Sequence, residues 1–364
     1  MLVILAYITL IFFGLRFLTA LTNVIFSPVL KPCSQSDDSL VSVLIPARNE
    51  GNNLSNILSD LQKQSYRNVE VIVFNDESTD NTKELAESFS RIDSRFHVID
   101  SGGLPDGWLG KTHACYQLAK QAHGEYLLFL DADVRTESGF IESGLAQMRN
   151  QKLKMLSIFP KQEMKTLGEK ITVPVMNFIL LSLLPLILTR ISSRSSLAAA
   201  NGQFMLFEKN TYFQLKPHET VKNELTEDIL IARLYKKRGQ KIQCMTGNQT
   251  IRCRMYRNLS EALNGFSRNI AEFFGGSHPM ELFYWLIGTF GIFAVIFSQP
   301  LTIILVVLIL ITGINLFVSI SGRQSFLQNF CLAIPRQLFL GIIVFLSYRI
   351  KIRKKTRWKD RNIS

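Results

Sequence analysis

Cysteine is scarce in this chain, and its occurrences are scattered. The 364 residues contain five cysteines, and no two of them have the C-x-x-C spacing. An odd and dispersed set excludes a disulfide framework and argues against a zinc site, so we expect reduced thiols in a cytosolic domain. Charged residues are also few, at 19% against 47% hydrophobic residues. This composition is too apolar for a disordered chain and unusually apolar for a purely soluble protein.

Acidic residues are outnumbered, and the imbalance is concentrated in one place. The formal net charge is +12, and eight basic residues against Asp360 give the segment 349–361 a net charge of +7. A basic run directly after an apolar stretch is typical of the cytosolic flank of a membrane segment, where anionic lipids attract it. A nucleic-acid patch is the alternative, but neither interleaved aromatic residues nor a nucleic-acid-binding motif accompanies the run. We therefore expect a basic cytosolic tail over 349–364, with membrane lipids and no nucleic acid as partners.

The first long apolar run extends from Leu2 to Ile25. Neither a basic leader nor a small-residue cleavage site accompanies it, so residues 1–30 are expected to be a retained membrane anchor rather than a signal peptide. Arg16 interrupts the run. Because a charge is costly at the middle of a bilayer, we expect Arg16 near the cytosolic face, with its side chain reaching toward water.

Two further apolar runs, 283–298 and 301–320, are separated by Gln299 and Pro300, which predicts a helical hairpin. The next stretch, 326–348, contains Pro335, which leaves about a dozen uninterrupted apolar residues, too few for a span. We expect this stretch to be interfacial or re-entrant, within a membrane region over 281–348. One anchor and a two-span hairpin return the basic tail to the cytosol, whereas a third C-terminal span would place it outside.

Residues 40–275 alternate short β-rich runs with helical patterns, which is typical of a mostly parallel α/β sheet. We assign residues 31–280 to this domain. The expected strands are Val41–Ile45, Val69–Phe74, Phe96–Ile99 and Tyr126–Leu130, and the expected crossover helices are Ser55–Lys63 and Thr82–Ser90. The apolar stretch 171–191 is expected to be a helix in the membrane interface, because a single crossing there would separate Asp133 from Asp228.

Polar clusters follow three of the expected strands. Pro46, Arg48 and Glu50 follow the first strand, and Asp76 follows the second. In an open α/β sheet, ligands bind at the carboxyl ends of the strands, where Asp76 would accept hydrogen bonds from a base or a ribose. The alternative for both clusters is a turn that ends a strand and caps the next helix.

The third cluster, Asp131 and Asp133, follows the strand at 126–130. Two carboxylates two residues apart point the same way in an extended segment. Such a pair suits Mg²⁺ or Mn²⁺ bridging a diphosphate. A D-x-D pair alone is common by chance, but its position after a buried strand favours a functional site.

These three clusters, in this order, resemble the family 2 glycosyltransferases, which have the Rossmann-like GT-A fold and use nucleotide sugars. The resemblance covers residues 40–275. The segment Gly107–Tyr116 is similar to the region ahead of the D-x-D in bacterial 4,4′-diaponeurosporenoate glycosyltransferases and hopene-associated relatives. The sequence W-K-D-R at 358–361 is similar to the W-K-G-R ending of that group, and the layout of membrane segments matches as well.

The resemblance implies a role for each cluster. The residues that it places around the nucleotide sugar are Pro46, Arg48, Glu50, Asp76, Lys111 and Asp131. Asp76 contacts the base in this scheme, and Asp133 is the direct metal ligand. Many relatives have Asp and Gly where this chain has Asn75 and Glu77. Lys111 would balance the diphosphate charge, with an ordinary exposed lysine as the alternative.

Two later segments complete the predicted site. Asn201, Gly202 and Gln203 are similar to the acceptor-side N-G-x-x segment of these folds, where glycine permits close approach to a sugar and the amides bind its hydroxyls. A polar turn is the alternative. Glu227 and Asp228 open a helical segment. The family places its catalytic base in this pair, which indicates Asp228, whereas a helix cap is the alternative.

The sequence therefore predicts a membrane-bound, inverting hexosyltransferase that needs Mg²⁺ or Mn²⁺. It would transfer a single sugar, glucose from UDP-glucose, to a lipid acceptor such as a carotenoid carboxylate in carotenoid biosynthesis. A processive polysaccharide synthase is one alternative, but the Q-x-x-R-W signature is missing because no tryptophan follows Arg268. A non-catalytic membrane scaffold is the other. We expect a multi-pass protein of the cell membrane with a cytoplasmic catalytic domain.

Overall fold

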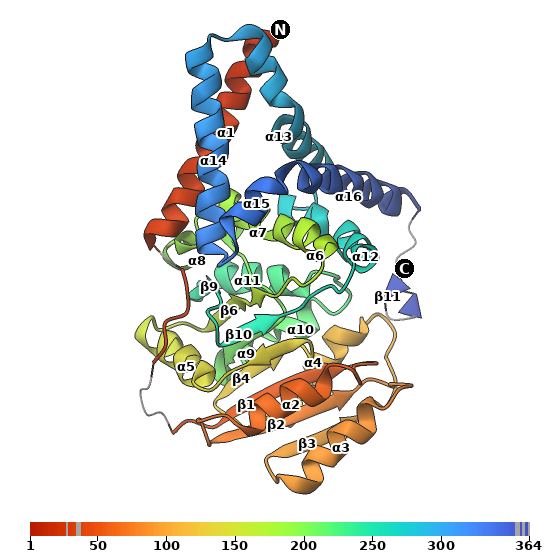
Figure 1. Cartoon of the computed structure of the whole chain (residues 1–364). Coiled ribbons are helices and arrows are strands. Elements are labelled where there is room, and N and C mark those ends of the chain that lie inside the picture. Colours follow the sequence, from red (N-terminus) through yellow and green to blue (C-terminus); the bar gives the residue numbers. More distant parts are fainter. Residues whose placement is uncertain (27, 34–37, 354–356, 359–360, 363–364) are drawn as a thin grey trace. The chain divides into compact units, whose positions relative to one another are not determined.

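The computed structural model describes residues 1–26, 28–33, 38–353, 357–358 and 361–362. The chain forms two compact units, which are shown in Figure 1. The sheet unit comprises Val29–Glu163 and Leu186–Arg254, and the helical unit comprises Met1–Pro28, Met164–Pro185 and Met255–Ser364. Each unit is described separately below.

The sheet unit is built on a mixed, mostly parallel sheet, as expected. In the described chain this sheet has seven strands, in the order β3 (Phe96–Asp100), β2 (Val69–Asn75), β1 (Val41–Ala47), β4 (Tyr126–Leu130), β8 (Phe204–Glu208), β6 (Met155–Phe159) and β9 (Ile242–Thr246). Strand β8 runs antiparallel to both of its neighbours, and the other pairs are parallel. The four strands expected from the sequence are confirmed to within two residues at either end.

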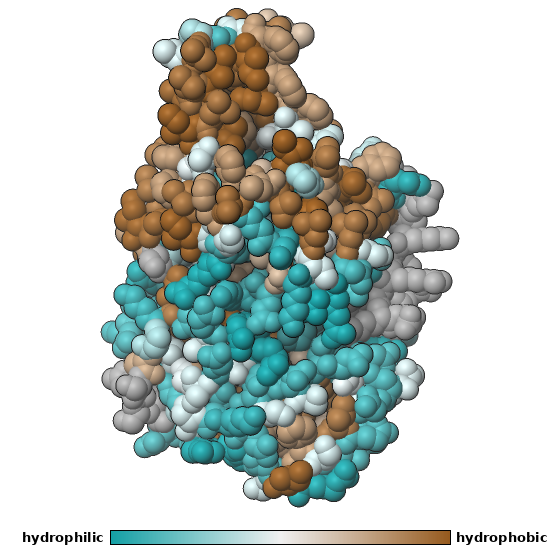
Figure 2. Space-filling model, viewed as in Figure 1, coloured by the Kyte–Doolittle hydropathy of each residue, from teal (hydrophilic) through white to brown (hydrophobic). Residues whose placement is uncertain are grey.

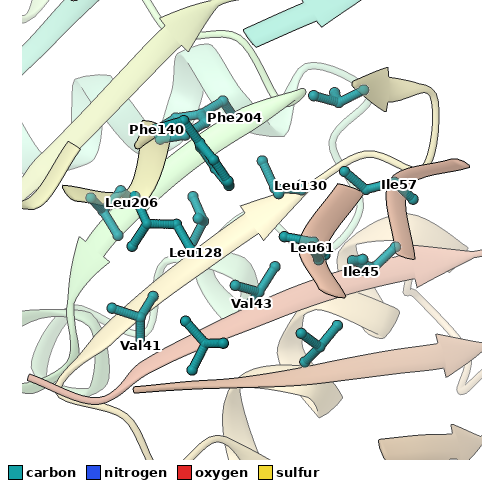
Figure 3. Packing of buried hydrophobic residues seen from close by; sticks show 14 of the residues in the cluster. Val41, Val43, Ile45, Ile57, Leu61, Leu128, Leu130, Phe140, Phe204 and Leu206 are labelled. Carbon is teal, nitrogen blue, oxygen red and sulfur yellow. The ribbon is translucent and has the colours of Figure 1, made fainter. Parts of the chain in front are cut away.

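Helices cover both faces of this sheet. One face packs against α2 (Leu54–Gln62), α3 (Thr82–Ile92) and α5 (Phe140–Asn150), and the other against α4 (Gly110–Gln121), α9 (Lys209–Leu215) and α11 (Glu227–Lys237). Figure 3 shows the first core, where Val43 of β1, Leu128 of β4 and Leu61 of α2 come together. Because both faces are buried, a strand such as β4, with the sequence YLLFL, is apolar along its whole length rather than alternating.

Smaller elements complete the sheet unit. A second sheet joins β5 (Val134–Thr136), β10 (Ile251–Cys253) and β7 (Lys161–Gln162). Strand β5 begins directly after the D-x-D pair, so β10 is brought next to that pair. The remaining helices of this unit are α8 (Ile187–Ile191), η1 (Ser195–Leu197) and α10 (Pro217–Thr220).

The helical unit contains four helices, among the described residues, that are long and apolar enough to cross a membrane: α1 (Leu2–Phe26), α13 (His278–Ser298), α14 (Leu301–Ser321) and α16 (Ala333–Arg353). Helix α1 packs against both α13 and α14. Shorter helices accompany them: α6 (Leu167–Thr172), α7 (Pro174–Leu183), α12 (Leu259–Asn269), η2 (Ile270–Phe274) and α15 (Phe326–Cys331). Figure 2 shows hydrophobic residues gathered over α1 and α14.

The C-terminal stretch differs from the expectation of a short, proline-interrupted segment. Pro335 lies in the first turn of α16, where a proline is tolerated, so the helix continues unbroken to Arg353. Its length therefore suffices for a crossing. In Figure 1, however, α16 runs crosswise to α1 and α14. That orientation agrees with an interfacial helix, which stays a prediction.

Three further expectations need correction or limits. The apolar stretch 171–191 is divided among short helices, of which α7 has ten residues, because Pro174 and Pro185 fall at or near helix ends. Arg16 does not reach water: its side chain is 5% exposed and faces the interior of the helical unit. Residues 359–360 of the W-K-D-R segment lie outside the described residues, and the backbone on either side forms a two-stranded sheet of β11 (Arg357–Trp358) and β12 (Arg361–Asn362).

Candidate active site

The loops that carry the predicted site meet at one edge of the large sheet. Strands β1, β2 and β4 are parallel, so their carboxyl ends lie at the same edge. The antiparallel strand β8 starts at this edge, because Phe204 pairs with Leu130. The N–H of Asp131 donates to the carbonyl oxygen of Gln203 (3.4 Å). The topology thus brings residues far apart in the sequence into contact.

Arg48 and Asp76 form the first group at this edge. An Nη1–H of Arg48 donates to the carbonyl oxygen of Asp76 (2.6 Å), and the same atom lies 4.0 Å from the Asp76 carboxylate. Asp76 is 2% exposed, and its N–H donates to the carbonyl oxygen of Ala47. The N–H of Asn49 donates to Ser78, which ties the loops after β1 and β2 together. Pro46 lies in β1 opposite Phe74.

Lys111 lies at the start of α4 between two carboxylates. Its Nζ is 2.8 Å from Asp131 Oδ1 and 3.3 Å from Glu227 Oε1. The side chain is 25% exposed, so the alternative of an ordinary surface lysine does not fit. Burial by itself lowers the pKa of Lys111, but the charges of Asp131 and Glu227 raise this pKa well above its ordinary value. Lys111 is therefore a fixed positive charge at the centre of an acidic site.

Asp133 is the carboxylate of the pair that has no cation partner among the described residues. Its Oδ2 accepts a long hydrogen bond from Gln203 Nε2 (3.4 Å), and within the described chain its buried Oδ1 has no hydrogen-bond donor. Burial and the negative charge of Asp131 raise the pKa of Asp133 to about 7. A bound cation would satisfy the vacant oxygen and favour the ionised form. The chemistry of this carboxylate therefore fits a divalent metal.

The described residues contain no group of three or more His, Cys, Asp or Glu side chains that could hold a metal ion by themselves. Mg²⁺ characteristically binds through one or two carboxylates together with substrate phosphates and water. Asp133, with Asp131 and Glu50 nearby, suits this mode of binding. Glu50 is close enough for its charge to raise the pKa of Asp133, which links the loop after β1 to the D-x-D pair.

Asp228 faces Gly202 across the site. Its Oδ2 accepts the N–H of Gly202 (3.0 Å), and its Oδ1 accepts the N–H of Ile229 (2.8 Å). Burial and the charge of Glu227 raise the pKa of Asp228 to about 7 despite these two donors. Thr226, at the helix N-cap, makes no capping side-chain hydrogen bond. A helix cap alone does not explain the hydrogen bond from Gly202, because this bond holds the Asp228 carboxylate against another loop.

The three residues of the segment 201–203 make different contacts. The N–H of Asn201 donates to Ser157 Oγ (2.8 Å), and its Oδ1 accepts the N–H of Gln203 (2.8 Å), so this side chain shapes the turn. Gln203 reaches Asp133, while Gly202 leaves room for Lys111 and Glu227. Sugar binding by these residues stays a prediction.

Sequence reasoning missed Cys253. This buried residue on β10 accepts a hydrogen bond from Gln203 Nε2 (2.8 Å) at its Sγ, and its thiol lies beside Asp133 and partly opposes the rise in the pKa of Asp133. No motif marks a lone cysteine after Arg252, so only the pairing of β10 with β5 reveals it. Arg252 itself pairs with Glu163 (3.1 Å) and Glu137 (2.9 Å).

The buried histidines are structural. His218 bonds to the hydroxyl of Tyr212 (2.7 Å), and burial lowers the pKa of His218 to about 3, so it stays neutral. His113 bonds to Gln117 and packs edge-on against the rings of Phe74 and Trp108.

Residues 42–189 match the model of glycosyl transferase family 2. The protein is a glycosyltransferase. Curated relatives agree with this assignment: a 4,4′-diaponeurosporenoate glycosyltransferase of Staphylococcus haemolyticus (strain JCSC1435) is 26% identical over 343 residues, which are 89% of this chain and 88% of the relative. The protein of the same name from Staphylococcus aureus (strain USA300) is 27% identical over 68% of this chain and 66% of its own length.

A solved structure supports the GT-A fold of this glycosyltransferase. The mannosyltransferase PcManGT of Pyrobaculum calidifontis, in complex with GDP-Man and Mn²⁺, aligns with 98% of this chain and 100% of its own, with a TM-score of 0.58 and 14% identity. At this identity the likeness concerns the fold. This likeness agrees with the expected GT-A fold.

Substitution of Gly202 by Ala is expected to lower catalytic efficiency while leaving the fold intact. A Cβ at this position would lie 2.9 Å from Lys111 Nζ and 3.4 Å from Glu227 Oε1. The lysine end is flexible and would move, so we expect about a tenfold to hundredfold loss of kcat/KM from misplaced charge. Steady-state kinetics of Gly202→Ala would be compared with those of Gly144→Ala, whose added methyl group fits beside Leu206. Equal kinetics in the two variants would contradict this prediction.

Proposed function

We propose that this glycosyltransferase transfers a single sugar from a nucleoside diphosphate donor to a lipid acceptor, with inversion at the anomeric carbon. The donor we propose is UDP-glucose and the acceptor a carotenoid carboxylate, in line with the names of the curated relatives. The observation that carries the proposal is the carboxylate of Asp228, held by Gly202 and without a cation partner among the described residues, beside the Lys111–Asp131–Glu227 cluster.

The donor would be bound by the residues at the edge of the sheet. We expect Arg48 and Asp76 to contact the nucleotide base and Asp131 to hold the ribose or the sugar. The carboxylates outnumber Lys111 here, so a diphosphate needs further positive charge. Asp133 would hold a divalent cation, in keeping with the Mn²⁺ of the mannosyltransferase complex. Such a cation neutralises the diphosphate and so makes it a better leaving group.

Asp228 would act on the acceptor. A carboxylate whose pKa is about 7 accepts a proton from an attacking hydroxyl at neutral pH, while the nucleoside diphosphate leaves from the opposite face of the sugar. One displacement of this kind inverts the anomeric centre. If the acceptor is a carboxylate, it is already ionised and Asp228 has less to do as a base.

The acceptor is proposed to be a lipid because the same chain carries apolar helices. Four described helices are long and apolar enough to cross a membrane, which supports a membrane protein. We propose that the N-terminal anchor over 1–30 and the membrane region over 281–348 hold the catalytic domain on the cytoplasmic side of the cell membrane. The free cysteines of the described residues fit a reducing compartment.

Mass spectrometry of lipid extracts tests the proposal. Cells that express the protein should contain a lipid heavier by one hexose residue than in cells without it, and cells that express Asp133→Asn should not. A product carrying many sugars would favour a processive synthase instead. Absence of any new glycolipid, together with no hydrolysis or transfer of the donor by the purified protein, would favour the non-catalytic scaffold.

With a hydroxyl acceptor, the transfer rate is expected to fall as the pH decreases through about 7, because both Asp133 and Asp228 have pKa values raised to about 7 and must be ionised to work. Excess metal should shift to lower pH the part of the pH–rate profile that reports the ionisation of Asp133, because the cation favours the carboxylate form. The part that reports the ionisation of Asp228 should not move. Rate profiles at low and saturating Mn²⁺ measure this, and a profile that stays flat around neutral pH would contradict it.

A further inference from the structure

Two buried arginines lie in the apolar interior of the helical unit, far along the sequence from the transferase residues. Arg16 of α1 and Arg336 of α16 are each 5% exposed. The charges of the two side chains are close enough to interact, and the hydroxyl of the buried Tyr284 lies near both. Among the described residues, no carboxylate pairs with either arginine. A pair of buried positive charges in apolar surroundings is costly unless an anion compensates them.

The hydrogen bonds of the two arginines leave donors unused. Arg336 donates to the carbonyl oxygen of Asn329 (3.1 Å) and to Asn315 Oδ1 (2.9 Å), and it stacks over Phe178 with 3.6 Å between its Cζ and the ring centroid. Arg16 donates through Nε to Ser182 Oγ (3.0 Å). Within the described chain, neither Nη group of Arg16 has a hydrogen-bond acceptor. Arg336 is therefore committed to structure, whereas the outer edge of the Arg16 guanidinium is available.

The spare donors converge beside a glycine. A Cβ placed on Gly288 of α13 would lie 3.7 Å from Gln337 Nε2 and 3.9 Å from Arg16 Nη1. In the described part of the chain, Gln337 Nε2 also has no acceptor, while Gln337 Oε1 accepts from Thr289 (3.5 Å). The same Cβ would lie 3.8 Å from Phe12 Cε1, so these are ordinary contact distances, and Gly288 has no side chain that would cover the two donor groups.

Apolar side chains surround these donors. The guanidinium of Arg16 stacks on Phe12 (5.1 Å) and Tyr284 (4.8 Å). Phe12 in turn packs edge-on against Phe283 (6.3 Å between the ring centroids), which is an exposed large hydrophobic residue. A small inorganic anion would leave this surface uncovered, whereas a molecule with an apolar chain would cover it.

We propose that Arg16 and Gln337, beside Gly288, form a binding site for the oxyanion headgroup of an amphiphile. Phosphate and carboxylate headgroups share the required chemistry, because each offers oxygen acceptors to the guanidinium and the amide. All residues of this site belong to the helical unit. The proposal does not depend on the proposed sugar transfer, because it is tested by measuring lipid binding.

Binding to the detergent-solubilised full-length protein tests the site. The probes are phosphatidylglycerol for the phosphate arm, oleate for the carboxylate arm, and methyl oleate as an uncharged control, with affinity measured by native mass spectrometry. We expect Arg16→Gln to weaken binding of the preferred anionic probe about tenfold, which corresponds to about 1.4 kcal/mol. Gly288→Val should weaken it similarly, because the added side chain would cover both donors without removing either. Arg323→Gln, which removes an exposed charge from the same unit outside the basic tail, should leave it unchanged.

The outcomes separate the possibilities. Preference for phosphatidylglycerol would assign the site to a membrane phospholipid, and preference for oleate would assign it to a carboxylate amphiphile. Equal binding of methyl oleate, or of inorganic phosphate without an acyl chain, would overturn the proposal. Loss of thermal stability in Arg16→Gln with lipid affinity unchanged would also overturn it, since Arg16 would then only hold helices together.

Discussion

Replacement of Asp133 by Asn is expected to reduce sugar transfer at least about a hundredfold, because the variant loses the carboxylate that would hold the divalent cation. The same substitution should raise the unfolding temperature of the metal-free protein at neutral pH. The pKa of Asp133 is 3.8 in the reference state and about 7 in the fold. Between pH 3.8 and about 7, the folded state therefore keeps a proton that the unfolded state releases. The stability of the wild type falls as the pH rises through this range.

Thermal unfolding with and without Mn²⁺ and UDP distinguishes this variant from one that is misfolded. The wild-type protein should gain stability from the metal and nucleotide together, whereas Asp133→Asn should gain much less. Asp106→Asn is the matched control, since Asp106 is an exposed aspartate of the same unit. An Asp133→Asn protein that transfers sugar at the wild-type rate would refute the role given to this carboxylate.

Replacement of Asp228 by Asn should have an effect that depends on the acceptor. With a hydroxyl acceptor, loss of the base is expected to lower the rate about 10²–10⁴-fold. With a carboxylate acceptor the rate should stay near that of the wild type, because the nucleophile needs no deprotonation. Asn keeps an oxygen for the N–H of Gly202 or Ile229, so the loops should stay in place.

Turnover with matched pairs of lipid alcohols and lipid acids measures this difference. The stabilisation of Asp228→Asn by Mn²⁺ and UDP should remain, which separates loss of the base from loss of the donor site. Equal and large losses with both kinds of acceptor would show that Asp228 positions substrate rather than accepting a proton. Negligible losses of turnover with both kinds of acceptor would show that Asp228 takes no part in the reaction.

Local pattern predicted much of the sheet unit. Strand β4 is a short apolar run bounded by polar turns, and burial on both faces makes that pattern easy to recognise. The acidic residues after β2 and β4 could be predicted to share an edge because parallel strands end together. Strand β8, which runs antiparallel, was not anticipated, since strand direction is set by pairing with β4 and β6 rather than by its own residues.

The sequence by itself determined the fold class, the apolar helices and which loops carry the chemistry, because these follow from local periodicity and from motif order. Only the tertiary structure decided that Lys111 lies between Asp131 and Glu227, that Cys253 lies beside Asp133, and that Arg16 points inward. Each of these facts joins residues distant along the chain. Their contacts, burial and pKa values depend on packing, which no local sequence pattern encodes.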